Sequence, residues 1–369
     1  MIDAMDNQAF ASPSEPSFSS LIPLRAVDFF CGAGGMSFGL SQAGIRVLGG
    51  VDNSIDCKKT YEANVSGAVY IRRDISRLTA PELGRRLGLQ VNDPELILCG
   101  CSPCQFWSKI RTDKTKSVKT AFLLKKFQKF IRHFRPGYVV VENVPGLYRS
   151  KDNSILADFQ KFLSRLGYNF QDGVINANHF GVPQNRKRYL LIASRVRVIS
   201  PLSTDATESR LNVSDFIGMT NGFPNITHGH RDQTDFLHTT AKLSEKNLRR
   251  ISVTPTGGNR FAWAENMDLQ INAYRNKDHM FRDVYGRMAW NRPAPTITTR
   301  FISLSNGRFG HPDENRAISI REGAALQTFP IDYRFHGKSI NALARQIGNA
   351  VPPALAKRIG VHLSSVHHG

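Results

Sequence analysis

The chain has 369 residues, 41% of them hydrophobic and 21% charged, which is typical of a globular protein and excludes wholesale disorder or a fibrous repeat. Its 49 Lys and Arg against 30 Asp and Glu leave a formal net charge of +19, which favours a polyanionic partner, nucleic acid first, although solvated basic faces would give the same count. The five cysteines are irregularly spaced, which predicts an intracellular protein without structural disulfides. The chain has no apolar run of about 20 residues, and its N-terminus lacks the basic and then apolar segments of a signal peptide, so we expect a soluble protein.

Short β-rich runs alternate with amphipathic stretches after residues 1–22, a Ser- and Pro-rich segment that we expect to be a flexible leader. Apolar residues at helical spacing predict helices at Ala121–Phe134 and Ser154–Leu166. The alternation predicts a parallel sheet covered by helices, with strands at Arg25–Phe30, Arg46–Val51, Val69–Arg73, Leu96–Cys99, Tyr138–Val141 and Tyr189–Ala193.

The regular alternation stops near residue 195, and this change predicts a second lobe. Residues 196–340 contain irregular polar segments, Gly and Pro turns, and scattered basic and aromatic residues. Apolar periodicity returns in Ile340–Leu363, interrupted by Pro352 and Pro353. We therefore expect a first lobe of residues 23–195, a smaller irregular lobe of 196–340, and a helical segment of 341–369 that returns to the first lobe.

A glycine-rich turn follows the first expected strand, in the segment Asp28–Leu40. Glycines let the backbone approach a ligand closely, and the N-terminus of the following helix offers free N–H groups, so a nucleotide-like cofactor fits there. Asp52 and Asp74 end the next two expected strands. The carboxylate of Asp52 can accept hydrogen bonds from ribose hydroxyls, and that of Asp74 can accept one from an adenine amino group. A glycine-rich turn alone is weak support, because tight connections and dinucleotide enzymes use it too.

Cys104 lies in Cys101-Ser-Pro-Cys104-Gln-Phe-Trp-Ser108, directly after the expected strand Leu96–Cys99 and so at the carboxyl edge of the sheet, where open α/β folds bind ligands. Three interpretations remain open here. The two cysteines can form a redox pair, ligate a metal, or supply a nucleophile on a turn held by proline. No second Cys pair and no His at ligand spacing follows, which disfavours zinc.

Two further charged groups are predicted at the same edge. Glu142 follows the apolar strand Tyr138–Val141. Burying a carboxylate there costs free energy, which suggests that the group has a functional role. Arg186 and Arg188 precede the strand Tyr189–Ala193. A solvated charge run is the common alternative for such a basic cluster.

Seven motifs in order resemble those of the DNA cytosine-5 methyltransferases and cover residues 25 to 356. They are Phe30-x-Gly32-x-Gly34-Gly35, Pro103-Cys104-Gln105, Glu142-Asn143-Val144, Gln184-x-Arg186-x-Arg188, Arg292-Pro-x-Pro-Thr296, Arg321-Glu-x-x-x-Leu-Gln327-x-Phe-Pro330 and Gly348-Asn349-x-Val351-Pro352. The resemblance implies a Rossmann-like α/β lobe that uses S-adenosyl-L-methionine and a smaller lobe that recognises the DNA target.

The resemblance also implies a mechanism. The Cys104 thiolate adds to carbon 6 of a cytosine flipped out of double-stranded DNA, and carbon 5 then attacks the sulfonium methyl group. Glu142 would hold ring nitrogen 3 and the exocyclic amine, and Arg188 would steady the base and its developing charge. We hypothesise that Arg186 helps to form the thiolate, because a free thiol with a pKa of about 8.5 is mostly protonated at neutral pH.

The family pattern assigns two further sets of residues. The cofactor set is Phe30, Gly32, Gly34, Gly35, Asp52, Asn53, Asp74, Ile75, Pro103, Asn349 and Ala350. The DNA-binding set is Gln105, Ser108, Lys109 and Arg111 after the nucleophile, with Arg249, Arg250, Gly257, Gly258, Asn259 and Arg260 as base readers. The sequence departs from the pattern in two places, because the ribose acid is usually Glu and the loop after Ser108 lacks a glycine often found there.

Three rival functions remain: methylation of cytosine in transfer RNA, DNA binding without catalysis, and redox chemistry by Cys101 and Cys104. The separate basic lobe favours duplex DNA, and the complete set of Cys104, Glu142 and Arg188 favours catalysis. The compact chain suggests a bacterial modification enzyme that acts in the cytoplasm as a monomer. A restriction endonuclease of the same target site is an optional partner, no metal is required, and the target sequence is not predicted.

Overall fold

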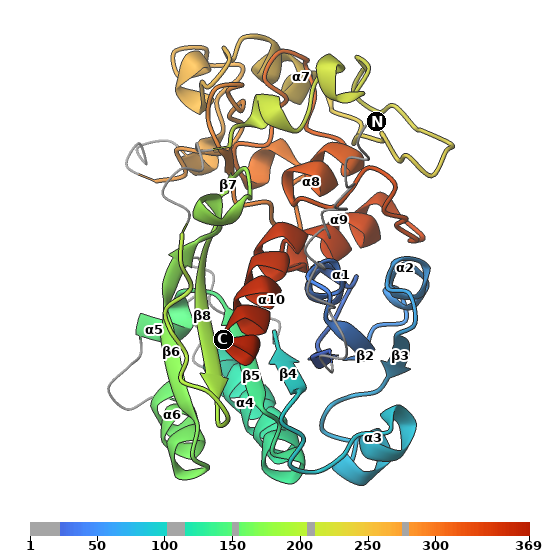
Figure 1. Cartoon of the computed structure of the whole chain (residues 1–369). Coiled ribbons are helices and arrows are strands. Elements are labelled where there is room, and N and C mark those ends of the chain that lie inside the picture. Colours follow the sequence, from blue (N-terminus) through green and yellow to red (C-terminus); the bar gives the residue numbers. More distant parts are fainter. Residues whose placement is uncertain (1–22, 102–114, 150–154, 205–210, 275–279) are drawn as a thin grey trace, which may run out of the picture.

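The computed structural model describes residues 23–101, 115–149, 155–204, 211–274 and 280–369. Within these residues, seven strands form one sheet beneath a second, irregular lobe (Figure 1). Their order across the sheet is β3 (Val69–Arg72), β2 (Arg46–Asp52), β1 (Arg25–Phe29), β4 (Leu96–Gly100), β5 (Tyr138–Asn143), β8 (Lys187–Ser194) and β6 (Asn169–Asn176). The predicted α/β class is confirmed.

The prediction of a wholly parallel sheet is wrong at β8, which runs antiparallel to both β5 and β6. Only residues 177–186 separate β6 from β8, too few for the helical crossover that a parallel pair needs. The sequence analysis also missed β6. This strand lies at the edge of the sheet with a mixed polar sequence, so it lacks a continuous apolar run.

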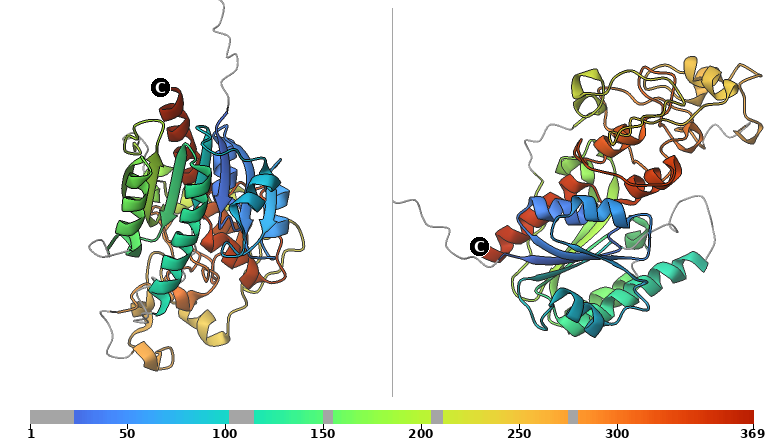
Figure 2. Two further views of the ribbon diagram at one scale, coloured as in Figure 1. Left: turned by 90° about the horizontal axis from the view of Figure 1, so that it is seen from below. Right: turned by 90° about the vertical axis from the view of Figure 1, so that its right-hand side faces the viewer.

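Helices cover both faces of the sheet (Figure 2). Side chains alternate along each strand, so Ala26 of β1 faces one core and Val27 the other. One face packs against α1 (Gly35–Gln42), α2 (Lys58–Asn64) and α10 (Pro353–His368). The other packs against α3 (Ala80–Leu87), α4 (Thr115–Phe134) and α6 (Ile155–Arg165), while α5 (Gly146–Arg149) follows β5.

The final helix returns to the sheet, where α10 packs along α1. Leu355, Ile359 and Leu363 recur every four residues and are fully buried, and each contributes about 1.5–3 kcal/mol by leaving water. Pro353 begins the helix, a position where its missing N–H costs nothing. The preceding α9 (Ile340–Asn349) packs with α8 (Ile320–Leu326) and also contacts the first lobe, where Gln346 donates to the carbonyl oxygen of Asp56 (3.0 Å).

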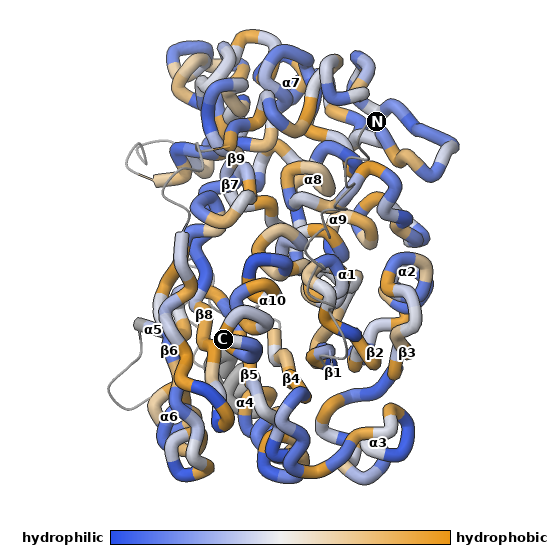
Figure 3. The backbone as a smooth tube through the Cα atoms, viewed as in Figure 1, coloured by the Kyte–Doolittle hydropathy of each residue, from blue (hydrophilic) through white to orange (hydrophobic). Residues whose placement is uncertain are grey.

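The second lobe has two smaller cores and little regular structure. Figure 3 shows hydrophobic residues along the strands of the sheet but only short hydrophobic segments in this lobe. Besides α7 (Glu245–Ser252), α8 and α9, it contains short 3-10 turns at Val213–Asp215, Met219–Asn221, Arg260–Trp263, Asn272–Tyr274 and Leu304–Asn306. Gln184–Asn185 (β7) pairs with Ala294–Pro295 (β9) and joins the two lobes, after the 3-10 turn Ala177–Phe180.

Candidate active site

A cavity of about 1470 Å³ lies along the carboxyl edge of the sheet and is lined by both lobes. The ends of β1, β2 and β5 form one wall, and residues 296–306 and 340–351 form the other. Open α/β sheets bind ligands at this edge, because neighbouring strand ends and loops leave a crevice there. The cavity is therefore the candidate active site.

The glycine-rich turn forms the tight end of the cavity. Phe30, Gly32 and Gly34 all have positive φ values, of 62°, 51° and 93°. Gly34 is the N-cap of α1, so the first N–H groups of that helix point toward the turn. A Cβ atom on Gly35 would lie 2.2 Å from the carbonyl oxygen of Val351, and only glycine permits this approach.

Two acids lie at neighbouring strand ends and line the cavity. Asp52 accepts hydrogen bonds from the backbone N–H groups of Gly32 (3.0 Å) and Ser54 (2.8 Å), while burial raises its pKa. Asp74 is exposed, and hydrogen bonds from the hydroxyl and N–H of Ser76 lower its pKa. Each carboxylate keeps lone pairs for a ligand, because two oxygens offer about four acceptor positions.

The remaining described cofactor candidates also line the cavity. Asn53 is exposed and Ile75 is buried beside the two acids, which provides an apolar contact for a flat ring. Asn349 is exposed at the end of α9, and Ala350 is buried. The donor set fits S-adenosylmethionine, because it combines acids, apolar surface and free N–H groups around a backbone turn that admits no extra side chain.

Glu142 and Arg188 form an ion pair in the same cavity, with Arg188 Nε 3.0 Å from Glu142 Oε1. Their side chains are only 10% and 13% exposed. The antiparallel direction of β8 brings them together, because the start of β8 then lies beside the end of β5. Among the described residues, Arg188 is the near cation but its N–H is not aligned for a hydrogen bond to Glu142 Oε1, so this oxygen keeps a lone pair for a ligand.

Arg186 also lines the cavity, where its guanidinium is held by backbone groups. Its side chain is 2% exposed, and its guanidinium donates to the carbonyl oxygens of Ile297 (3.0 Å) and Ala350 (2.9 Å). Gln184, also buried, donates to Gln327 (2.8 Å) beside it. Arg186 therefore holds the backbone of the second lobe and the α9–α10 turn while also lining the cavity, and its role in forming the Cys104 thiolate stays a prediction.

Cys101 directly follows β4, is partly exposed and lines the cavity. Burial, and secondarily the charge of Glu142, raises the pKa of its thiol well above the usual range. The segment 102–114 joins the end of β4 to α4, and its predicted site residues lie outside the described residues. These are Pro103, Cys104, Gln105, Ser108, Lys109 and Arg111.

Two predicted base readers are buried, so direct base contact is not retained for them. Arg250 is 7% exposed and donates to the carbonyl oxygen of Leu269 (2.8 Å). Arg260 is 6% exposed and donates to the carbonyl oxygen of Phe281 (3.3 Å). Arginine hydrogen bonds to nearby carbonyls stabilise a lobe that has few backbone ladders of its own.

The other predicted readers, Arg249, Gly257, Gly258 and Asn259, are partly or fully exposed but do not line the cavity. Polar residues that the sequence analysis missed line it from the second lobe: Lys242, Asn247, Arg300, Ser303, Ser305 and Asn306. Arg300 lies four residues after Thr296, the end of a recognised motif, and that proximity was the available signal.

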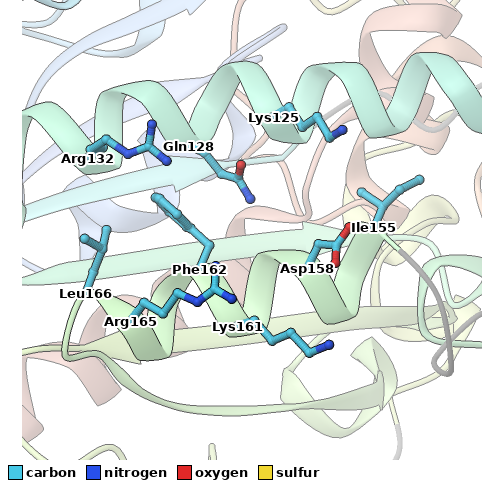
Figure 4. A pocket seen from close by; sticks show the side chains of 9 residues that line it. All are labelled: Lys125, Gln128, Arg132, Ile155, Asp158, Lys161, Phe162, Arg165 and Leu166. Atoms are coloured by element: carbon cyan, nitrogen blue, oxygen red, sulfur yellow. The ribbon is translucent and has the colours of Figure 1, made fainter.

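A smaller hollow of about 340 Å³ lies between α4 and α6, on the face of the sheet that these helices cover (Figure 4). Arg132 stacks over the ring of Phe162 there, at 5.4 Å from the centroid. The described residues that line this hollow include four cations but no thiol, imidazole or hydroxyl group. We therefore assign no reaction to it.

The seven-stranded fold and the edge cavity define an α/β enzyme of the methyltransferase class. Residues 24–365 match the family model of the C-5 cytosine-specific DNA methylases. The chain belongs to this family, which confirms the resemblance seen in its motifs. It is an enzyme that methylates cytosine in DNA.

The curated relatives agree with this assignment, and a solved structure shares the fold. The chain is 37% identical over 351 residues to the type II methylase M.HgiDII of Herpetosiphon aurantiacus, covering 92% of this chain and 96% of that protein. It is 32% identical over 363 residues to the type II methyltransferase M1.BsuMI of Bacillus subtilis (strain 168), covering 92% and 80%. The Dnmt2 methyltransferase of S. pombe shares the fold, with a TM-score of 0.59, 18% identity, and coverage of 93% of this chain and 98% of that chain.

Proposed function

We propose that the chain transfers a methyl group from S-adenosylmethionine to carbon 5 of a cytosine flipped out of a specific double-stranded DNA sequence, through a covalent bond from Cys104. The Glu142–Arg188 ion pair carries this proposal. It lies in the same cavity as the glycine-rich turn and Asp52, beside the end of β4, from which the chain continues to Cys104.

The chain's own residues activate the base. The Cys104 thiolate forms a bond to carbon 6, and Glu142 holds nitrogen 3 and the exocyclic amine so that the ring accepts the electron pair. Arg188 stabilises the charge that develops on the ring. The bound cofactor would supply the methyl group to carbon 5, with its sulfonium–methyl bond breaking to leave a neutral thioether. Carbon 5 would then lose its proton to water, and Cys104 would leave as the thiolate to restore the 5,6 double bond.

The bound cofactor supplies an electrophilic methyl group on a sulfonium centre. The turn Gly32–Gly35 and Asn349 would hold its amino-acid end, Asp52 its ribose, and Asp74 with Ile75 its adenine. Their positions along the cavity support this division, because each lies at a strand or helix end that faces the same space.

Arg300, Ser305 and Asn306 face this cavity from the second lobe, and the net charge of +19 supports a duplex DNA substrate. The naming of two relatives as type II enzymes favours a target shared with a restriction endonuclease. We further propose that the enzyme acts as a monomer in the bacterial cytoplasm, where such DNA is found. Within the described residues, no helix is long and apolar enough to cross a membrane.

The test begins with bisulfite sequencing of DNA from cells that express the chain, which identifies the methylated site. A duplex with 5-fluorocytosine at that site should then form a covalent complex with the protein only when S-adenosylmethionine is present, because the fluorine cannot leave as a proton does. Cys104→Ser should abolish trapping, and the matched variant Cys101→Ser should keep it. Methylation of transfer RNA with no activity on duplex DNA would support the rival substrate instead.

A further inference from the structure

The motif that begins at Arg321 has no part in the chemistry proposed above, yet the chain just after it lies against the glycine-rich turn. Tyr333 is 1% exposed, and its hydroxyl donates to the carbonyl oxygen of Ala33 at 2.5 Å, across 300 residues of sequence. Ala33 lies inside the turn Gly32–Gly35, and its side chain is buried in a core of the second lobe. The second lobe therefore forms one side of the turn.

Tyr333 is itself held by both lobes. The buried guanidinium of Arg321 donates to its carbonyl oxygen at 3.0 Å, and the ring of Phe329 packs on its ring with centroids 4.6 Å apart. From the first lobe, Phe38 of α1 makes an edge contact at 5.2 Å. Burial raises the pKa of Tyr333 above its usual range, so the phenol keeps its proton and acts as a donor.

The residues that follow Tyr333 extend this contact along α2. The hydroxyl of Thr60 accepts the N–H of His336 at 2.9 Å and donates to its carbonyl oxygen at 3.3 Å. The side chain of Asn64 accepts the N–H of Arg334 and donates to its carbonyl oxygen, both at 2.8 Å. Residues 333–336, which we call the lobe clip, therefore bind the first lobe through backbone as well as side-chain groups.

The turn has a conformation that needs such support. Phe30 has a φ of 62°, in the left-handed region that residues with side chains rarely adopt, and Gly32 and Gly34 also have positive φ values. Strained backbone of this kind persists only where the surrounding structure restrains it. A Cβ atom on Gly34 would lie 3.1 Å from the hydroxyl oxygen of Tyr333, so the phenol packs directly on the turn. Tyr333 therefore restrains the turn by a hydrogen bond and by packing.

We propose that Tyr333 is a positioning residue, which holds the carbonyl group of Ala33 so that the turn Gly32–Gly35 keeps its cofactor-binding conformation and cofactor affinity depends on the second lobe. This inference rests on the proposed function, in which the turn holds the amino-acid end of S-adenosylmethionine. Tyr333 is not one of the described residues that line the cavity, so it acts through the backbone of the turn. The motif that begins at Arg321 gains a role, because it holds Tyr333 in place.

The experiment compares two variants of the full chain that each lose one buried phenol hydroxyl. Tyr333→Phe keeps the ring and removes the bond to Ala33. Tyr168→Phe is the matched control, because its buried hydroxyl donates to the carbonyl oxygen of Pro136 at 2.6 Å, before β5 and so at the opposite end of the sheet. Calorimetric titration with S-adenosylhomocysteine, which transfers no methyl group, should give an affinity about tenfold weaker for Tyr333→Phe and unchanged for Tyr168→Phe.

Two further measurements separate positioning from a general loss of stability. Without cofactor, the amides of residues 30–36 should exchange with deuterium faster in Tyr333→Phe, but not in Tyr168→Phe. In methyl transfer, the KM for the cofactor should rise about tenfold in Tyr333→Phe, while kcat at saturating cofactor changes little, because the lost interaction supports binding. A merely structural role would lower the urea stability of both variants and move neither the exchange of the turn nor the KM.

A second variant keeps Tyr333 and loosens the lobe clip. Asn64→Ala removes both bonds to Arg334 at a partly exposed position, and it should weaken the affinity for S-adenosylhomocysteine about two- to threefold. Unchanged affinity and unchanged exchange of the turn in Tyr333→Phe would overturn the proposal, as would unchanged affinity in Asn64→Ala if Tyr333→Phe does not fold. Failure of the unaltered enzyme to bind the probe, or to be trapped on fluorinated DNA, would instead contradict the proposed function.

Discussion

The replacement Arg316→Met tests how the second lobe holds together. Arg316 is fully buried and donates to both oxygens of Glu322, at 2.7 and 2.8 Å, and to Glu314. Glu322 is 0% exposed and accepts the N–H of Ser319 at the start of α8. His311, Glu314 and Glu322 are grouped as metal ligands would be, but Arg316 already supplies the positive charge between the two glutamates.

The expected loss is about 3–5 kcal/mol of unfolding free energy, because removing one partner leaves a buried charge without compensation. The titration of Glu322 gives a similar figure. Burial raises its pKa, but the hydrogen bonds and charge of Arg316 outweigh this and lower the pKa from 4.5 to about 2. That difference corresponds to about 3 kcal/mol, which is present above pH 4.5 and lost as the pH falls toward 2.

Urea unfolding followed by tryptophan fluorescence is a suitable assay, because the ring of Trp290 lies 5.3 Å from that of His311 in this cluster. The double variant Arg316→Met/Glu322→Gln should recover part of the loss, since the fully buried position 322 then carries no charge. Arg308→Met is the matched control, because its partner Asp283 is 70% exposed and such pairs contribute about 0–1 kcal/mol. The reasoning would be refuted if Arg316→Met unfolded like the unaltered enzyme, or if the double variant were no more stable than the single one.

Three other replacements address the active site and its walls. Glu142→Gln should lower kcat by about 10²–10⁴-fold while the protein still binds cofactor, and an unchanged kcat would remove Glu142 from the chemistry. Gly348→Ala should destabilise the enzyme by about 1–3 kcal/mol in thermal unfolding, because its Cβ would lie 2.3–2.4 Å from the backbone of Thr298. An unchanged stability would mean that α9 and the segment around Thr298 can move apart at little cost. Arg300→Ala should weaken DNA binding. If Arg300 contacts a phosphate, the slope of log affinity against log salt concentration should fall by about one. An unchanged slope with a relaxed target preference would indicate that Arg300 contacts a base instead.

Much of the catalytic lobe could be predicted from short-range patterns. The strands β1, β2, β4 and β5 were expected within one or two residues of their observed bounds, because buried parallel strands are continuous apolar runs between turns. The strand β6 was not predicted, because this edge strand has no continuous apolar run. The motif order was sufficient to identify the family, and family membership was then confirmed by the match over residues 24–365.

The sequence by itself determined the family and predicted the chemistry-bearing residues, because motif spacing and apolar periodicity are local and can be read along the chain. Only the tertiary structure decided the partners of those residues. The guanidinium of Arg186 bonds to backbone 111 and 164 residues away, and β8 reverses direction so that Arg188 meets Glu142. The burial of Arg250 is equally invisible in the sequence, since it depends on which distant groups the folded chain places beside the side chain.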